Sequence, residues 1–225
     1  MPGIIYVLLI FLLGRELVPK AGRTRLWLFL PASFGLGALA MGWTSYAAAF
    51  AADVCLKWEN PLFYGNLAAM AGAGAVLVFR YVSRGKKKSV LPAFTVREAV
   101  FFLFLLAFLT WIMFYVFYIK DGILYSGFTV YGDYAPHTAM MRSFSLGDNF
   151  PTQYPHFGGE DVKYHFMFQF LVGNLEYLGI RIDIAYNMLS VSALLGFLVM
   201  LYSRARRRTG SGAAGVVTVA LFFFR

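Results

Sequence analysis

The sequence has little charge and a single cysteine. Only 14% of its 225 residues are charged, and 11 acidic residues stand against 20 lysines and arginines. A soluble domain usually carries about 25% charged residues, so this composition argues against an ordinary water-soluble fold. The one cysteine, Cys55, excludes an intramolecular disulfide and a cysteine-based metal cluster.

The sequence is instead rich in long apolar runs. Hydrophobic residues make up 60% of the chain and aromatic residues 19%, and the mean hydropathy is +0.64. A helix needs about 20 apolar residues to cross a bilayer. The sequence therefore predicts an all-α polytopic integral membrane protein. The predicted spans are residues 3–19, 26–52, 61–82, 96–118 and 184–203, with an incomplete span from 212 to 225.

The last apolar run is too short to cross a bilayer. It begins near residue 212 and reaches Arg225 before filling about 20 positions. We therefore expect the chain to be the N-terminal fragment of a longer protein. We predict three N-terminal spans in residues 1–95 and the start of a second helical region in residues 96–225.

Basic residues gather in short clusters beside the apolar runs. The clusters are Arg15, Lys20, Arg23 and Arg25 after the first run, Arg80, Arg84, Lys86, Lys87, Lys88 and Arg97 between the third and fourth, and Arg204, Arg206, Arg207 and Arg208 after the span 184–203. The positive-inside rule predicts that these loops are cytoplasmic and that residues 119–183 lie outside, in a cell membrane. The net charge of +9 is then a topology signal, and we expect no nucleic-acid partner.

The region 119–183 contains one more apolar piece, residues 162–180. If that piece spanned the bilayer, the arginine cluster after residue 203 would lie outside, against the positive-inside rule. Its polar residues also share one helical stripe, opposite a stripe of apolar ones. The polar stripe is His165, Gln169, Gly173 and Glu176, and the apolar one is Phe166, Phe170 and Leu178. We therefore predict an amphipathic helix that lies on the membrane surface.

A short helix is predicted from Tyr134 to Leu146, stopped by Gly147. It carries Asp133 and His137 four residues apart, and a neighbouring polar ridge of Thr138, Arg142 and Ser145. Asp133 could deprotonate an acceptor hydroxyl while Arg142 or a histidine holds a phosphate leaving group. The alternative is structural: Asp133 caps the helix, Arg142 faces lipid phosphates, and His137 bonds a carbonyl.

A second polar stretch, residues 153–165, holds two adjacent acids. Glu160 and Asp161 could ligate a divalent cation, Mg²⁺ or Mn²⁺, that bridges a phosphate, with Lys163 and His165 completing an anion site. Adjacent acids are also common in solvated turns, so an ordinary loop is the alternative.

This order of features resembles the GT-C glycosyltransferases, which take sugars from polyprenyl-phosphate carriers, as mannosyltransferases and aminoarabinose transferases of that superfamily do. The resemblance covers roughly residues 96–225. The residues that carry it are Asp133 at the start of the external loop, Tyr164 and His165 before the second external helix, Leu178-Gly179 closing it, Asn187 in the next span, and residues 202–210 at the end of that span.

The resemblance implies a GT-C-like helical bundle with external juxtamembrane helices. Asp133 is then the catalytic base, and the donor phosphate is bound by residues among His137, Arg142, Lys163, Tyr164 and His165. The sequence departs from the family in one respect, since Tyr134 follows Asp133 where a second acid often stands. Glu160 or Asp161 could supply that carboxylate.

The leading hypothesis is therefore a membrane glycosyltransferase that uses a polyprenyl-phosphate-linked sugar. The alternative is a non-catalytic membrane protein, either a transporter or a polysaccharide-assembly subunit. Transporters place functional ionisable groups inside their spans. The predicted spans are nearly free of such groups, which favours chemistry at the membrane surface.

Overall fold

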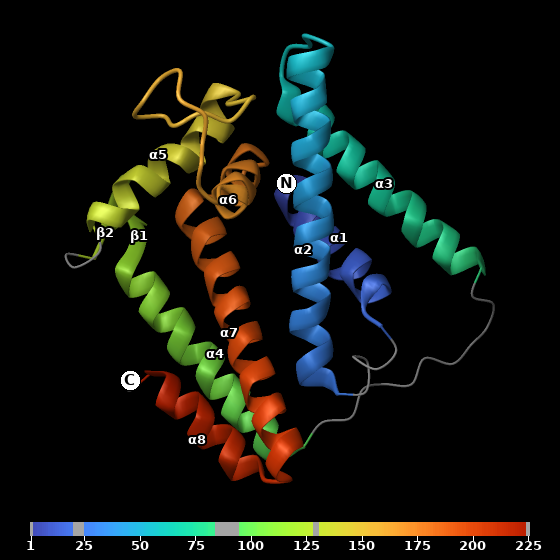
Figure 1. Ribbon diagram of the computed structural model, residues 1–225, viewed down its shortest axis with the longest axis vertical. Coiled ribbons are helices and arrows are strands. Elements are labelled where there is room, and N and C mark those ends of the chain that lie inside the picture. The colour runs from blue at the N-terminus through green and yellow to red at the C-terminus, as the bar shows by residue number, and fades with distance from the viewer. Residues whose placement is uncertain (1, 20–24, 84–94, 128–130, 224–225) are drawn as a thin grey trace.

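The structure is a computed structural model that describes residues 2–19, 25–83, 95–127 and 131–223. These residues form eight α-helices, a π-helical turn at the end of the second helix, and a two-stranded hairpin (Figure 1). The helices are α1 (Pro2–Leu17), α2 (Leu26–Phe50, extended by the π-helical turn Ala51–Cys55), α3 (Pro61–Ser83), α4 (Val96–Val116), α5 (Tyr131–Gly147), α6 (Met167–Tyr177), α7 (Ile182–Thr209) and α8 (Gly212–Phe223), and the strands are β1 (Phe117–Lys120) and β2 (Ile123–Ser126).

Among the residues that the structure describes, four helices are long and apolar enough to cross a membrane, namely α2 with its π-helical turn, α3, α4 and α7. In α4 only 17% of the apolar window is buried inside the protein. So much exposed apolar surface requires an apolar solvent, and the chain is an all-α membrane protein apart from its short hairpin. The predicted span 3–19 is a helix, but α1 has only 16 residues and is shorter than a typical span.

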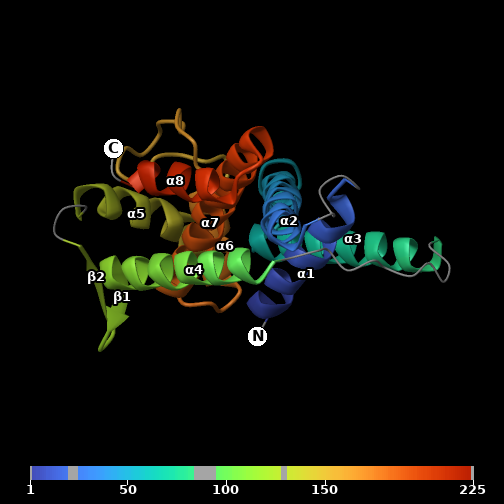
Figure 2. The same ribbon diagram turned by 90° about the horizontal axis from the view of Figure 1, so that it is seen from below.

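The helices form two groups that lie side by side (Figure 2). In one group α1 and α3 pack on α2, and in the other α4 and α8 pack on α7. Close packing of α1 on α2 depends on two glycines. A Cβ atom at Gly14 would overlap the carbonyl oxygen of Ser33, and one at Gly37 would overlap that of Ile10. Small residues allow helices to approach closely in a membrane, where packing drives association.

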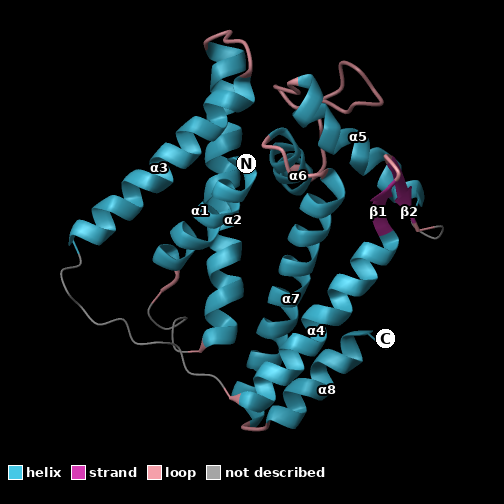
Figure 3. Cartoon of the chain, turned by 180° about the vertical axis from the view of Figure 1, so that it is seen from behind, coloured by secondary structure: helices cyan, strands magenta, loops and turns pink. Residues whose placement is uncertain are grey.

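The two ends of the bundle differ in charge and in content. One end of the bundle is where helices α2 and α4 begin and where α7 finishes (Figure 1). This end carries Arg25, Arg97 and Arg206. We call this the basic end. Helices α5 and α6 and the hairpin lie at the opposite end (Figure 3). The predicted topology signals at positions 20, 23, 84 and 86–88 lie outside the described residues.

Helix α6 is too short to cross a bilayer, because its 11 residues extend only about 16 Å. That agrees with the prediction that residues 162–180 do not span. The prediction of a helix with one side open to the membrane is wrong, however. All seven residues from Gln169 to Leu175 are buried, since α5, α2 and α7 pack around α6. The apolar stripe contributes to the protein core rather than facing lipid.

A hairpin replaces the last residues of the predicted span 96–118. Helix α4 ends at Val116, and β1 pairs antiparallel with β2. Asp121 and Gly122 form the turn with φ values of 51° and 77°, which suits a tight hairpin between twisted strands. The Ile119 N–H donates to Asp183 Oδ2 at 3.0 Å, so the hairpin is fixed to the start of α7.

Candidate functional site

The predicted site residues lie on α5, on α6 and on the loop between these helices. Helices α5 and α6 are in close contact at Gly173, where a Cβ atom would overlap the carbonyl oxygen of Met141. Phe144 of α5 packs edge-on against Phe170 of α6, and both side chains are fully buried. This packing fixes the rotation of α5 and decides which of its side chains face α6.

Asp133 lies in the first turn of α5 and is exposed. Because α5 begins at Tyr131, Asp133 is inside the helix, and the alternative that it caps the helix from the preceding position is wrong. A carboxylate in the first turn interacts favourably with the helix dipole. The exposed carboxylate is therefore accessible to a substrate at this end of the bundle.

His137 faces the start of α6. Its Nδ1 atom lies 2.8 Å from Nε2 of Gln169, and its ring centroid lies 6.4 Å from that of Tyr164. The rings of Tyr164 and His165 are 3.8 Å apart in turn. The structure thus brings His137, Tyr164 and His165 together. The exposed Lys163 directly precedes Tyr164 in the loop between α5 and α6.

Arg142 is held by the other end of α6. Its Nε atom donates to Oε1 of Glu176 at 3.3 Å, and Ser145 Oγ donates to Oε2 of the same carboxylate at 2.7 Å. Asp133 and Arg142 are nine residues apart, about 13 Å along the helix axis. The expected convergence of carboxylate, imidazole and guanidinium is therefore only partial, because Arg142 lies more than two turns beyond Asp133.

Arg142 also lines a pocket of about 380 Å³ between α5 and the hairpin. The other lining residues are Phe117, Leu124, Ser126, Tyr134, Ala135, Thr138 and Ala139. The pocket is mostly apolar, with one guanidinium and three hydroxyls. An amphiphile with an anionic group would match this lining.

Tyr134 forms one wall of this pocket. Its ring stacks on Phe117 with centroids 4.8 Å apart. Burial, together with the hydrogen bond and charge of Tyr186, raises the pKa of the Tyr134 phenol well above its ordinary value of 10.0. A phenol is protonated at neutral pH even at its ordinary pKa of 10.0, so Tyr134 is a hydrogen-bond donor there.

The predicted metal ligands lie farther from the helices. Glu160 and Asp161 are exposed neighbours in the loop, where Asp161 pairs with Gln153 and the Glu160 carbonyl accepts from the Tyr154 N–H at 3.0 Å. Within the described ranges, no group of three or more histidine, cysteine or acidic side chains is arranged to hold a metal ion. The metal site stays a prediction.

Sequence reasoning missed the hairpin, and with it three residues of the pocket: Phe117, Leu124 and Ser126. A signal was present, since Asp121-Gly122 between two runs rich in aromatic and β-branched residues, 117–120 and 123–126, is a strong hairpin pattern. It also missed that Asn187 ties α7 to the hairpin by donating to the Phe117 carbonyl at 2.7 Å. Comparisons with protein-family models, with curated proteins and with solved structures found no match.

Proposed function

We propose that this protein is a GT-C-like membrane glycosyltransferase that moves a sugar from a polyprenyl-phosphate carrier to an acceptor. The observation that carries the proposal is an accessible carboxylate, Asp133, one residue before the lining of a mostly apolar pocket that contains Arg142. A carrier lipid combines an apolar chain with an anionic phosphate, and this lining suits both.

The proposed reaction is a single displacement. Asp133 accepts the proton of the acceptor hydroxyl, and the acceptor oxygen bonds to the anomeric carbon as the bond from that carbon to the phosphate oxygen breaks. The polyprenyl phosphate leaves with the bonding electron pair, and its charge is met by Arg142. The products are an inverted glycoside, the free carrier phosphate and a protonated Asp133.

We infer that the reaction takes place on the extracytoplasmic side of a cell membrane. The basic end contains Arg25, Arg97, Arg204 and Arg206 to Arg208, and the positive-inside rule assigns such an end to the cytoplasm. Helices α5 and α6 are at the opposite end. His137, Lys163, Tyr164 and His165 are the further candidates for donor contacts, and Glu160 and Asp161 for a divalent metal.

Radiolabelled sugar transfer tests the proposal. Membranes containing the protein would be supplied with polyprenyl-phosphate-linked sugars, and wild type would be compared with Asp133→Asn at matched expression. We expect the variant to lose at least 100-fold in rate, as is typical when a general base is removed. Asp121→Asn is the matched control, an exposed acid in the hairpin turn at the same end. Unchanged transfer by Asp133→Asn would move the base to Glu160 or Asp161.

A second candidate is a non-catalytic protein that binds lipid-linked glycans for polysaccharide assembly. The separation of about 13 Å between Asp133 and Arg142 along α5 favours it, because a base and a leaving-group ligand must serve one reacting centre. Binding of the labelled carrier without transfer by wild type, lost in Arg142→Gln, would support this candidate and contradict the enzyme.

A further inference from the structure

The basic end of the bundle contains a buried carboxylate that joins three helices. Glu98 of α4 accepts from Arg25 Nη1 at 3.2 Å and from Thr95 Oγ1 at 2.7 Å, and Arg206 of α7 donates to the same Oε1 atom as Arg25. The Glu98 side chain is only 8% exposed. One negative charge therefore holds the starts of α2 and α4 and the end of α7 together.

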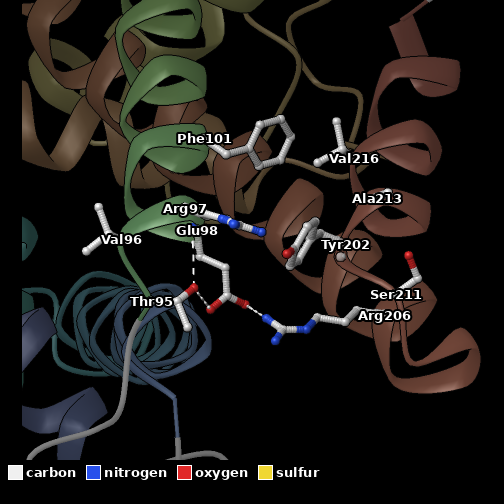
Figure 4. A pocket seen from close by; sticks show the side chains of 11 residues that line it. Thr95, Val96, Arg97, Glu98, Phe101, Tyr202, Arg206, Ser211, Ala213 and Val216 are labelled. Carbon is white, nitrogen blue, oxygen red and sulfur yellow. Dashed lines mark hydrogen bonds and ion pairs between the residues drawn. The ribbon is translucent and has the colours of Figure 1, made fainter.

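A pocket of about 820 Å³ lies beside this cluster, between α4, α7 and α8 (Figure 4). Its polar wall includes Arg97, Arg206 and Ser211, and its apolar wall includes Val96, Phe101 and Val216. Val96 and Val216 are 74% and 38% exposed, on helices whose outer surfaces are apolar. The rim of the pocket at Val96 and Val216 is thus apolar and lies on the side of the bundle.

Positive charge in this pocket exceeds negative charge. Glu98 is engaged by both Arg25 and Arg206, and Arg97 forms no ion pair with any described residue. Figure 4 shows the Arg97 guanidinium extending from α4 toward Tyr202. A cation in the first turn of a helix also opposes the helix dipole. An anion in the pocket would balance the excess positive charge and would offset the unfavourable interaction of Arg97 with the dipole of α4.

We propose that this pocket binds the phosphate headgroup of an anionic membrane lipid. Arg97 meets the phosphate, and the start of α8 supplies further hydrogen-bond donors. Ser211 Oγ already accepts from the Ala214 N–H at 3.4 Å, so Ser211 contributes its hydroxyl proton. The acyl chains pass over Val96 and Val216 into the bilayer. The apolar rim favours a lipid over a soluble phosphate, since a soluble anion gains nothing from apolar walls. The proposal does not depend on the proposed glycosyltransferase activity.

Native mass spectrometry of the full chain in detergent, titrated with dioleoyl phosphatidic acid, tests the site. We expect wild type to retain one lipid, and Arg97→Gln to bind it about tenfold more weakly, as expected for loss of one charge-assisted contact. Val216→Trp would fill the apolar side of the pocket and give a similar loss with the charges intact. Arg208→Gln is the matched control, because Arg208 is an exposed arginine at the same end that does not line the pocket.

Three results would overturn the proposal. One is equal lipid affinity in wild type, Arg97→Gln and Val216→Trp. Another is an equal loss in Arg208→Gln, which would mean diffuse attraction to the basic end. The third is complete displacement of the lipid by inorganic phosphate, which would assign the pocket to a soluble anion. Thermal unfolding in the same detergent shows whether each variant is folded. If Arg97→Gln does not fold, the lipid affinity of Val216→Trp tests the proposal.

Discussion

The side-chain amides of Asn66 on α3 and Asn174 on α6 exchange two hydrogen bonds across the protein core. Asn66 Nδ2 donates to Asn174 Oδ1 at 2.7 Å, and Asn174 Nδ2 donates to Asn66 Oδ1 at 2.8 Å. Both residues are buried, at 4% and 0% exposure. The pair links the N-terminal helices to the helix against which the candidate catalytic helix packs.

Replacing Asn174 leaves the Asn66 Oδ1 atom buried without its donor, although Asn66 Nδ2 still donates to the Leu62 carbonyl at 2.9 Å. Asn174→Leu should lower the free energy of unfolding by about 1–3 kcal/mol. The double variant Asn66→Leu, Asn174→Leu should be closer to wild type than the sum of the single variants, because no amide is then left unpaired. Thermal unfolding in detergent, followed by tryptophan fluorescence, measures all four proteins. Additive losses would contradict direct coupling.

The glycine contact between α1 and α2 gives a second prediction. In Gly37→Ala the new methyl group would overlap the Ile10 carbonyl, so α1 must move away, at a cost of about 1–3 kcal/mol. Gly35→Ala on the same helix is the control, since a Cβ atom there meets nothing within 4 Å. Alanine is the better helix former, so Gly35→Ala should be neutral or stabilising. Equal destabilisation by both would show that close approach is not the cause.

Much of the fold could be predicted from local patterns. The predicted helix Tyr134–Leu146 appears as α5, Tyr131–Gly147, because its polar ridge and terminal glycine are local signals. The arginine cluster after residue 203 led to the inference that residues 162–180 do not span, and α6 is indeed too short to do so. These features need only the sequence near them, together with a length and a charge rule.

What could not be predicted depends on contacts between distant segments. The stripe of Gln169, Gly173 and Glu176 was correctly placed on one helix face, but nothing local says that α2 and α7 cover the other face. The ion pairs of Glu98 join residues 73 and 108 positions apart. The separation of Asp133 from Arg142, by contrast, follows from their spacing of nine residues on the predicted helix.

A third prediction concerns pH. Partial desolvation of this exposed side chain, and to a lesser degree the charge of Asp53, raise the pKa of Asp148 above its ordinary value of 3.8. The folded protein then binds this proton more readily than the unfolded chain, so stability falls as pH rises from about 4 through the raised pKa. At pH 7 the charged Asp148 is a net cost. Asp148→Asn should therefore raise the unfolding temperature at pH 7, and the gain should shrink at pH 4.

The control for this variant separates charge from backbone effects. Asp148 and Asp121 both have positive φ, 45° and 51°, where asparagine is well tolerated. Asp121→Asn should change the unfolding temperature by the same small amount at both pH values. If both variants gain equally at pH 7 and pH 4, relief of backbone strain explains the effect and the charge of Asp148 does not.

The last prediction tests which end of the bundle is external. In a Cys55→Ser background, which removes the exposed native thiol, a cysteine would be introduced at Gly158 or at Thr209. Both positions are exposed, and a side chain at Gly158 meets nothing within 4 Å. Gly158 belongs to the loop between α5 and α6, and Thr209 ends α7 at the basic end. We expect an impermeant thiol reagent added to intact cells to label Gly158→Cys and to label Thr209→Cys only after the membrane is opened.

The two positions are informative together because, in the residues that the structure describes, α7 is the one candidate span between them. Gly158 reports on the end with α5 and α6, and Thr209 reports on the basic end. Labelling of Thr209→Cys from outside, with Gly158→Cys protected, would reverse the orientation and put α5 and α6 on the cytoplasmic side. Transfer from an externally exposed carrier would then be impossible at Asp133, although the lipid pocket at the basic end would still exist, now in the outer leaflet. Labelling of both positions in intact cells would mean that α7 does not cross the membrane, which its 28 residues and their apolar window of 18 oppose.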